Sequence, residues 1–539
     1  MDLLFLHTPK FNNYYKPIGR FSFIELPPIG LLGLADLLHR RGHSTKIVHL
    51  GVERQRAGRV DIEKIIATHN PGMIGLDLHW HFQAFDVIET AKAIKKNHPE
   101  IAVLLGGFTA SLFADEILGT FDCVDFIICG DAEVPLLDLL RHYSSDRDYH
   151  EVPNLAYRNG SVKRNAMSYV ADQEMIESLC YTNFSLMQDY KVFVDSFSRY
   201  MSLQDLSPET QRVLLHWKKS YPVMVGRGCM YECSYCGGSK TAQRAINNRN
   251  CVIVRSVEGV LESLQDLEKL GFEFANIPFD AMPPAHADEF YVPLFKGVAE
   301  RNIALGMEVE RYSLPSAEFL QAFRGMPKSD ESFVTLTAHC QNEELRRRNR
   351  LFRFSNNELE ACLELMGEHG VKCMLFFTSG LPFETAADMI ATARYQQDLQ
   401  KRFQLLHCKN SMIEIEPCSG IARESEHFQV IPHRATFADY YRYHSQPAKN
   451  HFLELGYDRI GSPNQQQAEQ FFCKHFCAHF RTGRIPPALN KSLCTALSLS
   501  RQTGALRVLD HIVSAWKGSA VIGLFTALTF AQSLPTVDV

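Results

Sequence analysis

The stretch VGRGCMYECSYCGGSK, residues 225–240, places Cys229, Cys233 and Cys236 within eight positions and surrounds them with glycines. A structural zinc site normally has four protein ligands, whereas the spacing CxxxCxxC supplies three together and offers no obvious fourth. Cysteine thiolates also hold iron–sulfur clusters, and a cubane with three protein ligands leaves one iron open to an exogenous ligand. The spacing therefore favours a reactive cluster, and a zinc site completed by a distant residue or a chance grouping remain as alternatives.

An α/β series surrounds this stretch and predicts its setting. It begins with YPVMVGRGC, and strand-like runs recur at FANIPF, IALGMEVE, FVTLTA, VKCMLFFTSG and SMIEIEP, with helical segments between them. This alternation predicts a βα barrel, complete or partial, over residues 217–420. In such barrels the chemistry lies at the carboxyl ends of the strands, and the three cysteines follow the first strand.

Residues 1–145 predict a separate doubly wound domain of the flavodoxin-like, or Rossmann-like, kind. Five short apolar runs alternate with helical patterns, at Leu3–His7, Thr45–Leu50, Met73–Leu78, Ala102–Leu105 and Asp125–Cys129. A ligand of this fold is expected at the carboxyl ends of the strands. Residues 146–216 are interpreted as a connector with a hairpin turn at Asn159–Gly160, and residues 421–539 as a mostly helical C-terminal region.

Composition limits the class of protein. Of 539 residues, 45% are hydrophobic and 22% are charged, which is typical of a soluble globular protein. The net charge of −5 gives no electrostatic footprint for nucleic acid or for a membrane surface. The apolar run at the amino terminus is too short for a signal peptide, and fifteen cysteines indicate a reducing compartment. We expect a cytoplasmic protein that acts on a small molecule or a peptide.

The motif CMYECSYC resembles the hallmark of the radical S-adenosylmethionine (SAM) superfamily, which has an aromatic residue before the last cysteine. The resemblance extends to the glycines after the motif and to its place after the first barrel strand. It implies that Cys229, Cys233 and Cys236 ligate a [4Fe–4S] cluster, that the open iron takes the amino and carboxylate groups of SAM, and that Tyr235 lies against the adenine. Reductive cleavage of SAM would then yield a 5′-deoxyadenosyl radical.

Further SAM contacts follow from the same resemblance. Asp280 stands in NIPFDAM, where the superfamily often has a Gly-Gly-Glu contact to the SAM amino group. Glu308 and Glu310 alternate along a strand, so either one could face a ribose, and Glu308 is the candidate; an ion pair is the competing interpretation. Gly380, in SGLPFET, looks like a turn after the fifth strand of cobalamin-linked members, although a generic turn would also explain it.

A flavodoxin-like domain ahead of such a barrel resembles the cobalamin-dependent branch. The loops VLLGGFTAS and FIICGDAE look like its fourth-strand and fifth-strand loops. Gly106 and Gly107 would admit the nucleotide tail of cobalamin, and Asp131 and Glu133 would accept hydrogen bonds from it. Tight turns and helix N-terminal charges are the alternatives for these four residues.

The axial histidine motif DxHxxG is missing after the first strand, but LDLHWHF follows the third strand. Cobalamin bound without a protein axial ligand is the default expectation. The alternative is that Asp77 orients His79 as a cobalt ligand, unless the two side chains only bond each other. In the C-terminal region, FFCKHFCAHF pairs Cys473 with Cys477 and His475 with His479 at helical spacing. Either an auxiliary metal site or a packed helix would explain that pattern.

Taken together, the resemblance implies a cobalamin-dependent radical SAM enzyme that methylates an unactivated carbon of a natural product or peptide. A flavodoxin or ferredoxin would supply electrons. The alternatives are a radical rearrangement or cyclisation without methyl transfer, and a cobalamin or metal sensor without turnover.

Overall fold

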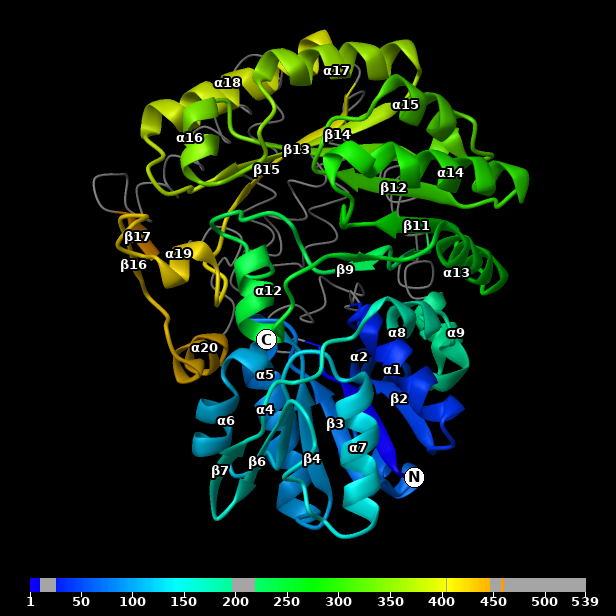
Figure 1. The fold of residues 1–539 in the computed structure, drawn as a ribbon, viewed down its shortest axis with the longest axis vertical. Helices are drawn as coiled ribbons and strands as arrows, with labels where there is room; N and C mark the ends of the chain where they lie inside the picture. Colours follow the sequence, from blue (N-terminus) through cyan, green and yellow to red (C-terminus); the bar gives the residue numbers. More distant parts are fainter. Residues whose placement is uncertain (10–25, 196–218, 404, 446–456, 460–539) are drawn as a thin grey trace.

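The computed structural model describes residues 1–9, 26–195, 219–403, 405–445 and 457–459. Figure 1 shows two sheet domains, one above the other, with β9 and α12 between them. The stretch that carries the three cysteines joins β9 to α12 and therefore lies where the two domains meet. Among the described residues, no helix combines the length and apolar character needed to cross a membrane.

The N-terminal sheet has the strand order β2-β1-β3-β4-β5-β6-β7. Its first five strands are parallel, so the predicted flavodoxin-like order is confirmed. The strands are β1 (Leu3–His7), β2 (Thr45–His49), β3 (Met73–Asp77), β4 (Ala102–Gly106), β5 (Phe126–Ile128), β6 (Leu155–Asn159) and β7 (Ser161–Arg164).

Helices cover both faces of this sheet, which explains why its strands are apolar throughout. Leu3 and Phe5 pack with the buried residues of α1 and α7, whereas Leu4 and Leu6 pack with those of α3, α4 and α6, because successive side chains of a strand point to opposite faces. The helices are α1 (Ile29–Arg40), α2 (Leu50–Ala57), α3 (Ile62–His69), α4 (Ala84–Asn97), α5 (Phe108–Leu112), α6 (Ala114–Thr120) and α7 (Glu133–Ser144).

The hairpin predicted at Asn159–Gly160 forms, but it is part of the N-terminal sheet and not of a connector. Strand β6 pairs antiparallel with β5, so the sheet continues to Arg164. The described residues that follow form α8 (Gln173–Ser178), the short helix η2 (Phe184–Leu186) and α9 (Tyr190–Val194). Met187 makes a β-bridge to Ile47, so this segment covers the opposite edge of the sheet.

The second domain is a partial barrel of six parallel strands in the order β15-β14-β13-β12-β11-β8. The strands are β8 (Ser220–Pro222), β11 (Phe274–Ile277), β12 (Gly306–Arg311), β13 (Phe333–His339), β14 (Lys372–Ser379) and β15 (Leu405–Met412). The main helices between and after them are α13 (Val257–Lys269), α14 (Ala287–Glu300), α15 (Ala317–Arg324), α16 (Glu343–Arg348), α17 (Asn356–Glu368) and α18 (Ala386–Arg402).

Two local predictions for the barrel are wrong. The last strand was expected at SMIEIEP, residues 411–417, but β15 ends at Met412, and the acidic residues after it lie in a loop. The first strand was expected to run directly into the cysteines, but β8 ends at Pro222. A separate strand, β9 (Gly226–Arg227), then pairs antiparallel with β10 (Ile253–Val254) and leads into the cysteine stretch before α12 (Lys240–Asn247).

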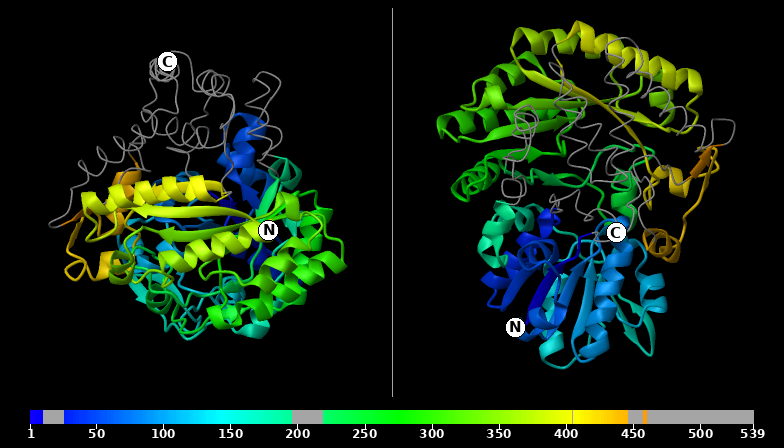
Figure 2. Two further views of the ribbon diagram at one scale, coloured as in Figure 1. Left: turned by 90° about the horizontal axis from the view of Figure 1, so that it is seen from above. Right: turned by 180° about the vertical axis from the view of Figure 1, so that it is seen from behind.

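After the barrel, the described part of the C-terminal region contains α19 (Gly420–Arg423), β16 (Val430–Pro432), α20 (Phe437–His444) and β17 (Tyr457–Arg459). Strands β16 and β17 pair antiparallel, so this part is not wholly helical. Helix α20 lies against the N-terminal domain beside α4 and α6, as the two opposite views in Figures 1 and 2 show. Residues 460–539, with Cys473, Cys477, His475 and His479, lie outside the described residues.

Candidate cluster and cofactor site

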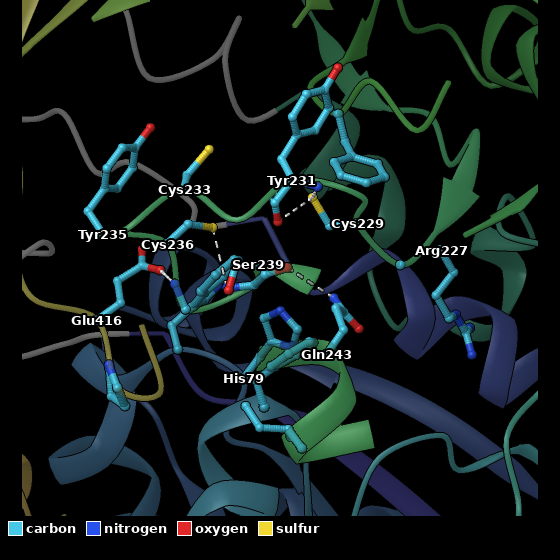
Figure 3. A pocket seen from close by; sticks show the side chains of 18 of the residues that line it. His79, Arg227, Cys229, Tyr231, Cys233, Tyr235, Cys236, Ser239, Gln243 and Glu416 are labelled. Carbon is cyan, nitrogen blue, oxygen red and sulfur yellow. Dashed lines mark hydrogen bonds between the residues drawn. The ribbon is translucent and has the colours of Figure 1, made fainter. Parts of the chain in front are cut away.

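The three cysteines line one cavity of about 400 Å³ between the two domains. Their side chains project from a single turn above His79 (Figure 3). Backbone amides bond two of the sulfurs: the N–H of Tyr231 donates to Cys229 Sγ at 3.4 Å, and the N–H of Gly238 donates to Cys236 Sγ at 3.3 Å. Such bonds stabilise thiolates and tune the potential of iron–sulfur clusters.

The donor set fits a cluster better than a single metal ion. Among the described residues, no three His, Cys, Asp or Glu side chains are gathered closely enough to hold one ion. A cubane spreads its ligands more widely, because each thiolate binds a different iron. Burial raises the pKa of Cys233 to about 12 and that of Cys236 well above its ordinary value, so these thiols would ionise only against a compensating positive charge such as iron.

Gly237 lets the cysteine loop pack closely against the loop that follows β15. Its N–H donates to Glu416 Oε2 at 2.6 Å, and a Cβ at this position would meet the carbonyl oxygen of Pro417 at 2.7 Å. The Glu416 side chain lines the cysteine cavity, and its burial raises the pKa of the carboxyl group. Sequence reasoning missed Glu416, because it stands in the segment that was predicted as a strand.

Tyr235 lines the same cavity, and its contact with the adenine of SAM stays a prediction. Its ring lies 5.8 Å from that of His339, at the carboxyl end of β13. His339 is fully buried and has a left-handed backbone (φ 61°), and neither ring nitrogen has a hydrogen-bond partner among the described residues. Burial lowers its pKa to about 3, so the ring is neutral. His339 does not itself line the cavity; it packs behind Tyr235.

The two glutamates of β12 face two different cavities. Glu310 lines the cysteine cavity, whereas the predicted SAM contact, Glu308, lines the second cavity and accepts a hydrogen bond from Thr335 Oγ1 at 2.8 Å. Burial and the neighbouring Glu308 raise the pKa of Glu310 to about 8, so at neutral pH it is mainly a protonated donor. Glu310 is thus better placed than Glu308 for a ligand at the cysteines.

Two other predicted SAM contacts do not fit the geometry. The buried carboxylate of Asp280 pairs with Arg311 Nε at 3.0 Å and accepts from Tyr291 Oη at 3.2 Å, so it holds the barrel together instead of facing a ligand. Gly380 is buried too; its N–H donates to Glu384 Oε2, and its carbonyl oxygen accepts from Tyr457 Oη. Neither residue lines the cysteine cavity.

A second cavity of about 700 Å³ lies at the carboxyl ends of the N-terminal strands, where the fold predicts a ligand. Gly106 and Gly107 both line it. A Cβ on Gly106 would meet nothing within 4 Å, so this glycine leaves free space for a ligand. Gly107 serves the fold instead, since it has φ 108° and a Cβ there would lie 2.8 Å from the backbone of His79.

His79, Trp80 and Arg227 line both cavities and so mark where they meet. Burial lowers the pKa of His79 to about 4, which keeps the imidazole neutral, as metal ligation requires. The predicted pairing of Asp77 with His79 is wrong: the Asp77 carboxylate bonds His7 Nδ1 at 2.9 Å. The described residues provide no hydrogen bond to the His79 ring nitrogens that would orient them.

Asp131 and Glu133 line the second cavity, but arginines of the cysteine-bearing segment occupy their carboxylates. Arg227 Nη1 lies 3.0 Å from Asp131 Oδ1 and 2.8 Å from Glu133 Oε1, and Arg249 Nη2 bonds Asp131 Oδ2. Both oxygens of Asp131 are therefore taken by contacts that join the two domains. Glu133 Oε2 has no hydrogen-bond partner among the described residues, so the prediction that Glu133 accepts a hydrogen bond from cobalamin stays a prediction. No sequence pattern pointed to either arginine.

Comparison with known proteins agrees with this architecture. Residues 18–140 match the family described as the B12 binding domain. The chain is 24% identical over 254 residues to the hopanoid C-3 methylase of Methylococcus capsulatus, covering 46% of this chain and 42% of that protein. It is 23% identical over 239 residues to the anaerobic magnesium-protoporphyrin IX monomethyl ester cyclase of Synechocystis, covering 44% and 42%. The chain thus spans less than half the length of these curated relatives.

A solved structure extends the likeness to the whole fold. The radical SAM methyltransferase TsrM of Kitasatospora setae, with cobalamin and a [4Fe–4S] cluster bound, matches with a TM-score of 0.62 at 15% identity, over 98% of this chain and 100% of that chain. The chain thus contains a match to the B12 binding domain and shares its overall fold with TsrM.

Proposed function

We propose that this protein is a cobalamin-dependent radical SAM enzyme that transfers a methyl group to an unactivated carbon. The observation that carries the proposal is the junction of the two cavities. One contains three thiols with the spacing of a cluster motif, one buried and two half-buried. The other opens at the ligand-binding edge of a B12 binding domain, and His79, Trp80 and Arg227 line both.

The residues divide between the cofactors as follows. Cys229, Cys233 and Cys236 would hold the [4Fe–4S] cluster, and Tyr235 and Glu310, which line the same cavity, would contact SAM. When bound, the cluster and SAM supply the 5′-deoxyadenosyl radical, and cobalamin supplies the methyl group. The apolar and aromatic residues that surround the cysteines exclude water, which would protect a radical from quenching.

At the second cavity, Gly106 leaves room for cobalamin, and His79 presents a neutral ring next to it. Since His79 has no orienting hydrogen bond in the described part of the chain, we propose that it packs against the cofactor and gives cobalt at most a weak ligand. Titration of hydroxocobalamin into the parent and into His79→Ala tests this role, because loss of a strong imidazole ligand would shift the visible spectrum.

The whole reaction remains part of the proposal, because the relatives match over less than half of their length. We propose a natural product or peptide as the substrate, a flavodoxin or ferredoxin as the electron donor and the cytoplasm as the location. The likeness to the Synechocystis cyclase supports one alternative, a radical cyclisation without methyl transfer. The products separate these two: methylation consumes a second SAM as methyl donor and releases S-adenosylhomocysteine, whereas cyclisation does not.

The first experiment is anaerobic purification with hydroxocobalamin present, followed by quantitation of iron, sulfide and cobalt. About four irons and one corrinoid per chain are expected. Reductive cleavage of SAM to 5′-deoxyadenosine should follow with the parent and disappear with Cys233→Ala. Cys251→Ala is the matched control, since Cys251 is exposed and outside the motif. Iron without corrinoid would remove methylcobalamin from the proposal, and zinc in place of both would refute it.

A further inference from the structure

Helix α20, which follows the barrel in the chain, completes the core of the N-terminal domain. Phe437 and Tyr440 are 0% and 1% exposed and belong to the same apolar cluster as the buried residues of α4 and α6. Their rings lie 5.7–5.9 Å from those of Phe113 and Phe121. The helix therefore holds the barrel and the N-terminal domain together from one side.

Polar contacts fix the start and the outer face of α20. The Glu116 carboxylate accepts from the N–H groups of Phe437 and Ala438 at 2.8 and 2.9 Å, where the helix dipole favours a negative charge. On the outer face, Tyr441 Oη donates to Glu89 at 2.7 Å. The position of the first turn of α20 is thus fixed by a carboxylate of α6, and the position of its last residue, His444, by a contact with the N-terminal domain.

His444, the last residue of α20, reaches the segment where the two cavities meet. Its Nε2 hydrogen-bonds His81 Nδ1 at 3.2 Å, and both side chains are buried. His81 follows His79 and Trp80, which line both cavities. A bond between the domains therefore lies next to the residues that would face the cofactor.

Further contacts of this segment, among the described residues, come from inside the N-terminal domain. Thr109 donates from its N–H and its Oγ1 to the His79 carbonyl oxygen at 3.3 and 3.0 Å. The Trp80 N–H donates to Gln83 Oε1 at 3.1 Å. Among these contacts, the bond to His444 is the one that depends on how the two domains are docked.

We propose that His444 is a positioning residue, which acts through His81 to hold His79 and Trp80 against the bound corrinoid. This inference rests on the proposed cobalamin site. Helix α20 then links domain docking to the geometry of that site, because a shift of the helix would move the segment that lines both cavities.

Three variants separate positioning from general packing. His444→Phe keeps a ring but removes the hydrogen bond, His444→Gln keeps a hydrogen-bonding group, and His444→Ala leaves space in case the phenyl ring does not fit. Tyr441→Phe is the matched control, because it removes a polar contact of the same helix on the face away from the cavities.

Two measurements are made on the full chain. The first is the affinity and visible spectrum of hydroxocobalamin. The second is tryptophan fluorescence, which needs no cofactor. The chain has three tryptophans, so replacing Trp217 and Trp516 by Phe leaves Trp80 as the one tryptophan that emits. The emission maximum of Trp80 and its quenching by acrylamide report the surroundings of its side chain.

We expect His444→Phe and His444→Ala to weaken hydroxocobalamin binding about tenfold, which is the effect of losing one buried hydrogen bond. Both should also change Trp80 quenching, while His444→Gln and Tyr441→Phe resemble the parent. If the parent binds hydroxocobalamin and the His444 variants match it in both measurements, the inference is refuted while the proposed function stands. A parent that binds no corrinoid overturns both.

Discussion

The ion pairs of Asp131 provide the most direct test of how the two domains are joined. Asp131 binds Arg227 and Arg249 through different oxygens, and its side chain is 5% exposed, while that of Arg249 is 0% exposed. Asp131→Ala would leave the Arg249 guanidinium buried without this counter-charge, whereas Arg227 would keep Glu133. Removing one partner of a buried pair typically costs about 3–5 kcal/mol, and we expect that loss of unfolding free energy here.

Asp122→Ala is the matched control. Asp122 pairs with Arg158 at 2.7 Å, but its side chain is 96% exposed, so about 0–1 kcal/mol is expected from its removal. Asp131→Asn, which keeps the shape and loses the charge, should lie between the two. Urea unfolding followed by circular dichroism and tryptophan fluorescence gives the midpoints. If Asp131→Ala shifts the midpoint no more than Asp122→Ala does, the ion pairs are not what joins the domains.

Three further predictions concern the cavities. In the apoprotein, the folded Glu310 carboxyl has a pKa of about 8, whereas the unfolded carboxyl ionises near 4.5, so the free energy of unfolding falls as pH rises between these values. Glu310→Gln should therefore raise the melting temperature more at pH 8 than at pH 5. An equal effect at both pH values would contradict the burial argument. Gly107→Ala should lower the free energy of unfolding by about 1–3 kcal/mol through backbone strain, whereas Gly106→Ala should leave it unchanged and weaken hydroxocobalamin binding by filling free space. Thermal melting and hydroxocobalamin titration measure the two effects, and similar melting temperatures of the two variants would argue against strain. Cys236→Ala should lose the cluster absorbance after anaerobic reconstitution while Cys251→Ala retains it. A Cys236→Ala protein with full iron content would show that the thiol is not a ligand.

The elements that sequence predicted well depend on local patterns. The strands of the N-terminal domain are apolar on both faces and alternate with helical segments, so their positions and parallel order follow from short-range patterns. The cysteine motif is local as well, since eight residues carry its spacing. Both signals can be read without knowing what the rest of the chain contacts.

The predictions that failed depend on contacts between distant residues. Asp131 looked like a free acceptor because Arg227 and Arg249, which neutralise it, come from the other domain. Asp280 looked like a ligand contact until the fold brought Arg311 against it. A period of two places Glu308 and Glu310 on the same face of a strand, but the packing of the two domains puts them in different cavities, which no local pattern shows.

The late position of α20 in the chain has a consequence for biosynthesis. The sheet of the N-terminal domain ends at Arg164, yet the aromatic residues that seal its far side are translated only after the whole barrel. At ribosomal rates of about 5–20 residues per second, the nascent domain waits tens of seconds with an apolar surface uncovered. During that interval chaperones can bind the uncovered apolar surface. A fragment that ends near Arg164 lacks α20 and would expose the same surface, so such a fragment should aggregate under conditions in which the full chain does not.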